Sequence, residues 1–173
     1  HGSIRRQRQM CIRDSLASVI LQMLALGLGD IAAFPFVQPP DNRNINDGFR
    51  LLEEIQAIAK HKNKMQLTKM GRSIARLPID PRYARMVIEA DSTNALNEVM
   101  VIAAGLSIQD PRERPQEKRQ QADESHSEFA DKDSDFISLL NLWLGFKEQQ
   151  NNLTQNQLRK WCKTRFINYL RMR

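Results

Sequence analysis

Apolar residues recur at helical spacing along most of this chain. The first such stretch places one face at i, i+3, i+4 and i+7, with Leu16, Val19, Ile20, Met23, Leu24 and Leu28. This pattern predicts a helix that Ser15 caps and that Gly27 and Gly29 end. A proline-containing connection should follow, and then a second helix that begins at Asn46 or Asp47. Its inner face is predicted to consist of Phe49, Leu52, Ile55, Ile58 and Ala59.

A short strand and a third helix complete the first predicted unit. Residues 64 to 68 alternate between polar and apolar, which indicates a strand. Thr68 is expected to cap a helix that runs from Lys69 to about Ala75. This order of elements predicts a winged-helix-like domain over residues 16–79. A small irregular helical bundle explains the same periodicity nearly as well.

Helices also dominate the predicted second domain, residues 80–173. Asp80 should cap a helix whose first residue is Pro81, where the missing amide costs nothing. Its predicted apolar stripe is Tyr83, Met86, Val87 and Ala90. Residues 95 to 107 predict a buried helix with an apolar set of Leu96, Val99, Met100, Ile102, Ala103 and Leu106.

The polar stretch from Arg112 to Ser127 is expected to be a loop with some helical tendency. Two amphipathic helices should follow it. The inner positions of the first are predicted as Phe136, Leu139, Leu140, Trp143, Leu144 and Lys147, and those of the second as Leu158, Trp161, Cys162, Phe166, Tyr169 and Leu170. The predicted fold class is therefore mainly α, a small winged-helix-like unit followed by a helical bundle.

Composition agrees with an ordered cytoplasmic protein. The chain has 173 residues, of which 41% are hydrophobic, enough for one sizeable domain or two small ones. No apolar run approaches the roughly 20 residues that cross a bilayer, so we expect no membrane contact. Two cysteines do not predict a disulfide framework. Residues 1–15 show no apolar periodicity and are interpreted as a tag or foreign segment, with a basic RNA-binding arm as the alternative.

The net charge of +6 is unevenly distributed. Residues 60 to 85 hold eight bases and one acid, and residues 155 to 173 hold six bases and no acid. Between them, residues 110 to 135 hold nine acids and five bases. Two basic blocks around an acidic one suit phosphate contacts on selected faces. Solvated helix faces would give the same charge runs.

The sequence offers little for catalysis. It lacks a GxxxxGK[ST] loop that would cradle a nucleotide phosphate, so this chain alone is not expected to bind ATP or to be an enzyme. Its histidines and cysteines have no metal-ligand spacing: His1, His61, His126, Cys11 and Cys162. We therefore predict no catalytic residue, metal or cofactor within the chain.

The last basic block gives the strongest binding candidates. Arg159, Lys163 and Arg165, with Lys160 beside them, are predicted to lie opposite or beside the apolar face of their helix, where they can meet RNA phosphates. Tyr169 or Trp161 could stack on a base if exposed, although aromatics at helical spacing more often belong to a core. Arg82 and Arg85 are further RNA-binding candidates, with pairing to the acidic middle segment, residues 110 to 135, as the alternative.

Residues 107 to 115, SIQDPRERP, have two interpretations. As structure, Asp110 and the two prolines make a stiff connection between helices. As a binding element, Arg112 and Arg114 are candidates for interdomain docking, through bidentate pairing with carboxylates of a partner domain.

Several motifs occur in an order that resembles bacterial DEAH-box RNA helicases. They are Leu67-Thr68 with Gly71-Arg72, Leu77-Pro78 with the run Asp80-Pro81-Arg82-Tyr83, then SIQDPRERP, Ala122-Asp123-Glu124-Ser125-His126, and SDFISLLNLW at residues 134–143. The first two motifs resemble the junction of the family's winged-helix domain with its ratchet, or helicase-associated, domain, and the other three are similar to the bacterial branch of the family. The resemblance covers residues 16 to 173.

The resemblance implies a fragment of an ATP-dependent RNA helicase, with its ratchet domain truncated at the C-terminal end. ATP and Mg would bind to RecA-like motor domains that this chain lacks. The expected partners are single-stranded RNA, those RecA-like domains and an oligonucleotide-binding fold. The chain would form part of the channel wall that holds RNA against the motor. The alternative is a protein–protein interaction module without direct nucleic-acid contact.

Overall fold

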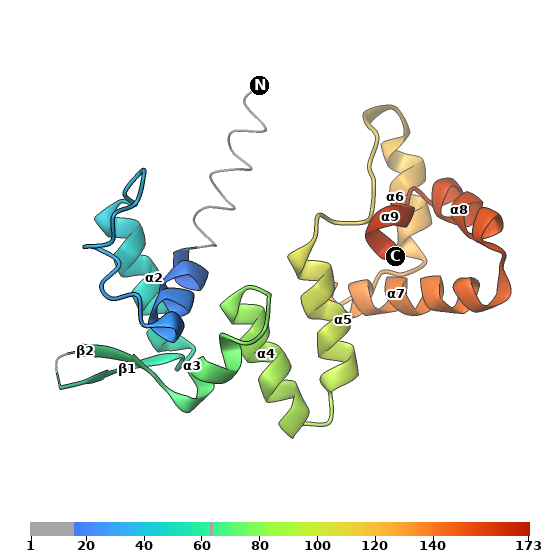
Figure 1. Ribbon diagram of the computed structural model, residues 1–173. Helices are drawn as coiled ribbons and strands as arrows, with labels where there is room; N and C mark the ends of the chain where they lie inside the picture. Colours follow the sequence, from blue (N-terminus) through green and yellow to red (C-terminus); the bar gives the residue numbers. More distant parts are fainter. Residues whose placement is uncertain (1–15, 63) are drawn as a thin grey trace. The chain divides into compact units, whose positions relative to one another are not determined.

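The computed structural model describes residues 16–62 and 64–173 (Figure 1). The predicted cap Ser15 and the predicted foreign segment lie outside these residues. By compactness the chain divides into unit 1, up to Ser92, and unit 2, Thr93–Arg173. The predicted fold class, mainly α, is confirmed, because the described residues form helices and one two-stranded sheet. The domain boundary at residue 80 stays a prediction.

Unit 1 combines helices with one hairpin. A helix over residues 16–26 precedes α2 (Asn42–Glu54), and α3 (Lys69–Ile74) and α4 (Pro81–Ser92) follow the antiparallel strands β1 (Ile58–His61) and β2 (Lys64–Leu67). The strand register runs from Ile58 opposite Leu67 to His61 opposite Lys64. The core of unit 1 includes Ile20, Leu21, Leu52, Ala57 and Ile74.

Local capping signals in unit 1 are confirmed. Gly27 adopts a φ of 67° just after the first helix, as predicted for its end. Thr68 Oγ1 accepts from the Gly71 amide at 2.9 Å and begins α3. Asp80 Oδ1 accepts from the Arg82 amide at 2.9 Å at the start of α4.

The predicted second helix needed two corrections. It starts at Asn42, because Asp41 accepts from the Arg43 amide and acts as the cap, ahead of the predicted Asn46 or Asp47. It also ends earlier than predicted, because Gln56 has a φ of 60° and turns the chain out of the helix. Ile58 and Ala59 consequently lie in β1, a strand that the sequence pattern did not predict.

Close backbone packing holds the hairpin on α3. A Cβ at Gly71 would lie 1.9 Å from the Ala57 carbonyl oxygen, so only glycine fits at this position. Thr68 Oγ1 also donates to the Gln56 carbonyl at 2.6 Å. The hairpin is therefore tied to both α2 and α3 at its base.

The buried face of α4 agrees with the predicted stripe only in part. Ala90 is buried as predicted, Tyr83, Met86 and Val87 are half-buried, and Pro81 and Ala84 are buried as well. The small side chain of Ala84 permits close packing, and an apolar-periodicity argument favours the larger residues beside it.

The regular elements of unit 2 are all helices. It contains α5 (Leu96–Ser107), a 3-10 turn at Gln116–Lys118, α6 (Arg119–Ser127), α7 (Asp135–Asn152), α8 (Gln155–Thr164) and α9 (Tyr169–Met172). Its core consists of Phe129, Leu142, Phe146, Leu158, Cys162, Ile167 and Met172. Helix α6 replaces most of the loop predicted for residues 112–127.

The apolar faces predicted in unit 2 were correct only in part. In α5 the predicted Ile102 and Ala103 are buried, and Met100 is the exposed member of the predicted set. In α7 the buried residues are Ser138, Leu142 and Phe146, which lie on a different face of the helix from the predicted set. Phe136 and Leu144 of that set are exposed. The predicted last helix is broken between Thr164 and Tyr169, since Phe166 adopts a φ of 54°, and Leu170 is exposed.

Candidate nucleic-acid interface

The turn between α8 and α9 is bound to the SIQDPRERP segment. The Glu113 amide donates to the Phe166 carbonyl at 2.7 Å, and the Asn168 amide donates to the Pro111 carbonyl at 2.7 Å. Arg112 and Ile167 form an antiparallel bridge between these bonds. We call this pairing of residues 110–113 with residues 166–168 the clasp.

Side chains reinforce the clasp from three directions. Asn168 Nδ2 donates to Glu113 Oε1 at 2.7 Å, and Asn168 Oδ1 caps α9. Arg171 Nη1 donates to the Asp110 carbonyl at 2.9 Å. His126, buried in α6, lies with Nε2 3.2 Å from the Phe166 carbonyl. The segment is thus a stiff connection that fixes the start of α9.

A carboxylate–guanidinium pair closes the turn at the beginning of the clasp. Arg112 Nε and Nη2 donate to the two oxygens of Asp110 at 3.0 and 2.9 Å. Burial raises the pKa of the Asp110 carboxyl, but the hydrogen bonds and charge of Arg112 outweigh burial and lower it below its usual value. The carboxylate is therefore ionised at neutral pH and keeps Arg112 engaged within the chain.

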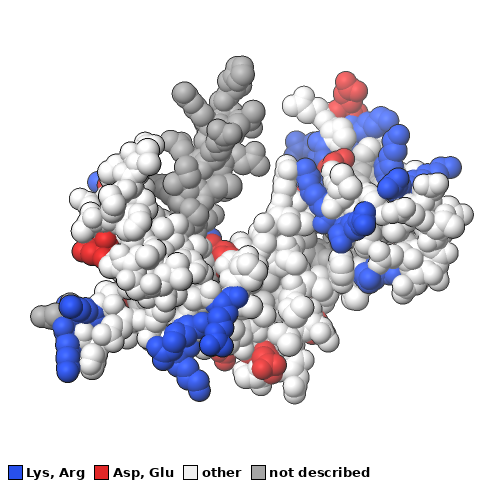
Figure 2. All heavy atoms as spheres, viewed as in Figure 1, with Lys and Arg blue, Asp and Glu red and all other residues white. Residues whose placement is uncertain are grey.

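Beside the clasp lies a cavity of about 900 Å³ with a basic lining. Its cations come from two segments, Lys118 on the 3-10 turn and Arg159, Lys160 and Lys163 on α8. Among the described residues, none of these four forms an ion pair with a carboxylate. We call this cavity the basic groove. Figure 2 shows basic side chains gathered over this part of unit 2.

Two aromatic residues, Phe166 and Tyr169, line the groove. Tyr169 is half-buried in its wall, its hydroxyl accepts from Gln155 Nε2 at 3.3 Å, and Arg159 Cζ lies 5.3 Å from its ring centre. Trp161 lies outside the groove lining, packs edge-on against Phe129, and has Arg165 4.7 Å from its ring centre. Of the two aromatic residues predicted to stack on a base, Tyr169 and Trp161, only Tyr169 lines the groove, and Arg159 lies over its ring.

The predicted RNA-binding residues divide between the two units. Arg159 and Lys163 line the groove, whereas Arg165 pairs with Glu128 at 3.3 Å. In unit 1, Arg82 pairs with Asp80 at 3.0 Å and Arg85 pairs with Glu89, both outside the acidic segment that the alternative named. The structure adds Lys118, which sequence reasoning missed because it lies among acidic residues.

The two predicted docking residues already have partners in the chain. Arg112 forms the pair with Asp110, and Arg114 Nε lies 2.8 Å from Asp123 Oδ1. Arg114 is still half-exposed, so part of its guanidinium faces solvent. Interdomain docking through these residues stays a prediction.

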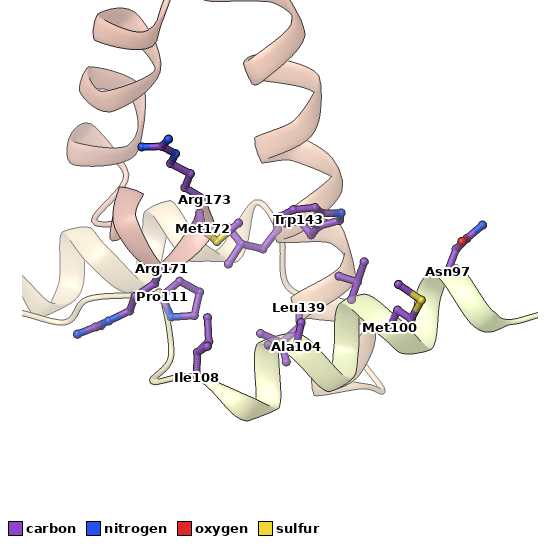
Figure 3. Close-up of a pocket in the computed structure, with 13 residues that line it drawn as sticks. Asn97, Met100, Ala104, Ile108, Pro111, Leu139, Trp143, Arg171, Met172 and Arg173 are labelled. Atoms are coloured by element: carbon purple, nitrogen blue, oxygen red, sulfur yellow. The ribbon is translucent and has the colours of Figure 1, made fainter. Parts of the chain in front are cut away.

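Unit 2 also contains an apolar pocket of about 520 Å³ (Figure 3). Ile108 and Met100 of the α5 segment, Leu139 and Trp143 of α7, and Met172 contribute to it. Arg171 and Arg173 lie at its edge. Among the described residues that line this pocket, none has a carboxylate, imidazole or thiol side chain for acid–base or nucleophilic chemistry.

Metal and thiol chemistry find little support in the described residues. Across residues 16–62 and 64–173, no group of three or more His, Cys, Asp or Glu side chains is arranged to hold a metal ion. Within the same ranges, no helix combines the length and apolarity required to cross a membrane. Burial raises the pKa of the Cys162 thiol to about 11, so this thiol is protonated at neutral pH.

Comparison with known proteins identifies close relatives. Residues 80–139 match the family described as "Helicase associated domain (HA2), ratchet-like". The chain is 56% identical over 164 residues to ATP-dependent RNA helicase HrpA of Escherichia coli (strain K12), and 54% identical over 166 residues to the HrpA homolog of Haemophilus influenzae. Each match covers 94% of this chain and 13% of the relative. Mouse ATP-dependent RNA helicase DHX33 is 29% identical over 156 residues, 90% of this chain and 22% of that protein.

Proposed function

Because this chain belongs with the HrpA-like bacterial DEAH-box RNA helicases, we propose that it forms part of the wall of a channel that holds single-stranded RNA. In the whole protein, RecA-like motor domains would bind ATP and Mg and move the RNA along this wall. An oligonucleotide-binding fold and the motor domains would be its neighbours, in the cytoplasm. We predict no ATP hydrolysis by the chain alone.

The basic groove is the observation that supports this proposal. Its four cations pair with no carboxylate of residues 16–62 or 64–173, so their charge remains available to phosphates. Lysine and arginine contacts to phosphates carry no sequence information, as a translocating enzyme requires. Tyr169 adds a ring whose face accepts any base.

The clasp explains how the groove keeps its shape without RNA. It fixes Phe166, Ile167 and Asn168, which line the groove between α8 and Tyr169. Groups already held in their binding geometry lose less conformational entropy on association. SIQDPRERP therefore acts as a positioning element, while the RNA contacts belong to Lys118 and α8.

Titration of a labelled, unstructured single-stranded RNA at two salt concentrations tests the proposal. We expect weak binding that decreases with salt. The double variant Lys160→Gln/Lys163→Gln should reduce the slope of log K against log salt by about 1.4, since each phosphate contact on a single strand contributes about 0.7.

The double variant Arg43→Gln/Arg50→Gln is the matched control. Both arginines are exposed on α2 and pair with no described carboxylate, so the same charge is removed away from the groove. Equal losses of RNA affinity in the two double variants would mean that net charge, and not the groove, accounts for the effect. No binding at low salt would favour the alternative, a protein–protein interaction module.

A further inference from the structure

Unit 1 carries a second concentration of positive charge, separate from the groove. Its members are exposed side chains of the β1–β2 hairpin, of α3 and of the turn after α3: Lys60, Lys62, Lys64, Lys69, Arg72 and Arg76. We call this set the hairpin surface. Figure 2 shows basic side chains at the end of the hairpin and beside α3.

Within the part of the chain that the structure describes, no carboxylate pairs with a cation of the hairpin surface. Residues 57 to 79 contain neither aspartate nor glutamate. Asp80, the next acid along the chain, is held by Arg82. Arg72 donates to the Leu67 carbonyl at 3.1 Å, and none of the six cations forms an ion pair with a described residue. A surface of this charge attracts a polyanion.

The hairpin holds these charges on a packed base. Ile58 is buried, and Met65 and Leu67 pack against the same core, so one face of the hairpin is anchored. The Gly71–Ala57 approach and the Thr68 hydrogen bonds join it to α3. The lysines therefore extend from a folded platform.

The hairpin surface differs from the groove in a way that selects its ligand. Residues 57 to 79 contain no phenylalanine, tyrosine or tryptophan. Binding of a single strand relies on aromatic rings that stack on its bases. A duplex has its bases stacked already and presents its phosphates, so cations alone suffice for it.

We infer that the hairpin surface binds the phosphate backbone of double-stranded RNA, while the basic groove takes the single strand. The choice of RNA rests on the proposed function, and the choice of a duplex rests on the missing aromatics. The unit that carries the hairpin would then grip RNA that has not yet been unwound.

The full chain can be titrated with a blunt RNA duplex and with one of its strands made unable to fold. Lys60→Gln/Lys62→Gln/Lys64→Gln should weaken duplex binding about tenfold or more at low salt. It should reduce the duplex salt slope by up to about 2.7, at 0.9 per phosphate contact. Single-strand binding should change less than twofold.

The control is Arg43→Gln/Arg50→Gln/Lys132→Gln, which removes the same charge from exposed positions outside both surfaces. The arginines before residue 16 are common to all variants and cancel. Absence of duplex binding at low salt, or equal losses for the hairpin and control variants, would overturn the inference. Hairpin-dependent duplex binding without single-strand binding would refute the groove proposal alone.

Discussion

Two buried polar side chains show what single residues contribute to unit 2. His126 shares the Phe166 carbonyl with the Glu113 amide, which requires a hydrogen on Nε2, and its Nδ1 is buried without a partner. His126 therefore contributes to the structure, by holding the turn between α8 and α9 against α6.

Cys162 gives a pH-dependent prediction at the same scale. The pKa of its thiol rises to about 11 through burial, from an ordinary value of 9.0. The unfolded chain then releases this proton at lower pH than the folded chain, so the stability is complete below about pH 9 and is lost towards about pH 11. The free energy of unfolding should fall by about 1.4 kcal/mol per pH unit between these limits.

Urea unfolding of the wild type and of Cys162→Ser across this pH range measures the effect. The serine variant lacks the titrating thiol, so its stability should fall less steeply, whatever its stability at neutral pH. Cys11 and the lysines titrate in both proteins and cancel in the comparison. Parallel pH profiles would contradict the prediction.

At the level of elements, local signals were predictable and long-range ones were not. The caps at Thr68 and Asp80 follow from residue types within three positions. The break between α8 and α9 depends on Phe166 pairing with Glu113, more than fifty residues away in the chain. Apolar periodicity therefore predicted one continuous helix across this turn, because the turn is explained only by tertiary hydrogen bonds. The same limit hid Lys118, whose place in the groove comes from the fold.

The clasp yields a prediction about elements. Asn168→Ala removes the α9 cap and the bond to Glu113 without changing charge. It should weaken single-strand binding about threefold or more, because the groove loses a fixed wall. Thr154→Ala is the control: it removes the capping box of α8 and should cost a similar stability, about 1 kcal/mol, at the other end of that helix.

Circular dichroism and RNA titration separate the two effects. Equal loss of affinity in both variants would mean that stability alone governs binding. Loss in Asn168→Ala alone would support the positioning role of the clasp.

For the whole molecule, the two basic surfaces have different chemistry in different units. The groove combines cations with Tyr169, and the hairpin surface has cations without aromatic residues. A basic block in the sequence predicted positive faces but did not distinguish these uses, because Arg82 and Arg85 of the same block are paired with acids. The distribution of carboxylates over the fold makes the distinction.

An RNA duplex with a single-stranded tail tests the two surfaces together. Combining Lys160→Gln/Lys163→Gln with Lys60→Gln/Lys62→Gln/Lys64→Gln removes charge from both. If the two sets of lysines contact separate phosphates and share no partner, the loss of binding free energy for the tailed RNA should equal the sum of the two separate losses within about 0.5 kcal/mol. If both sets of lysines competed for the same phosphates, the combined loss would be smaller than the sum. Additive losses on tailed RNA, with each variant selective for its own part of the substrate, would support a division of labour between the units.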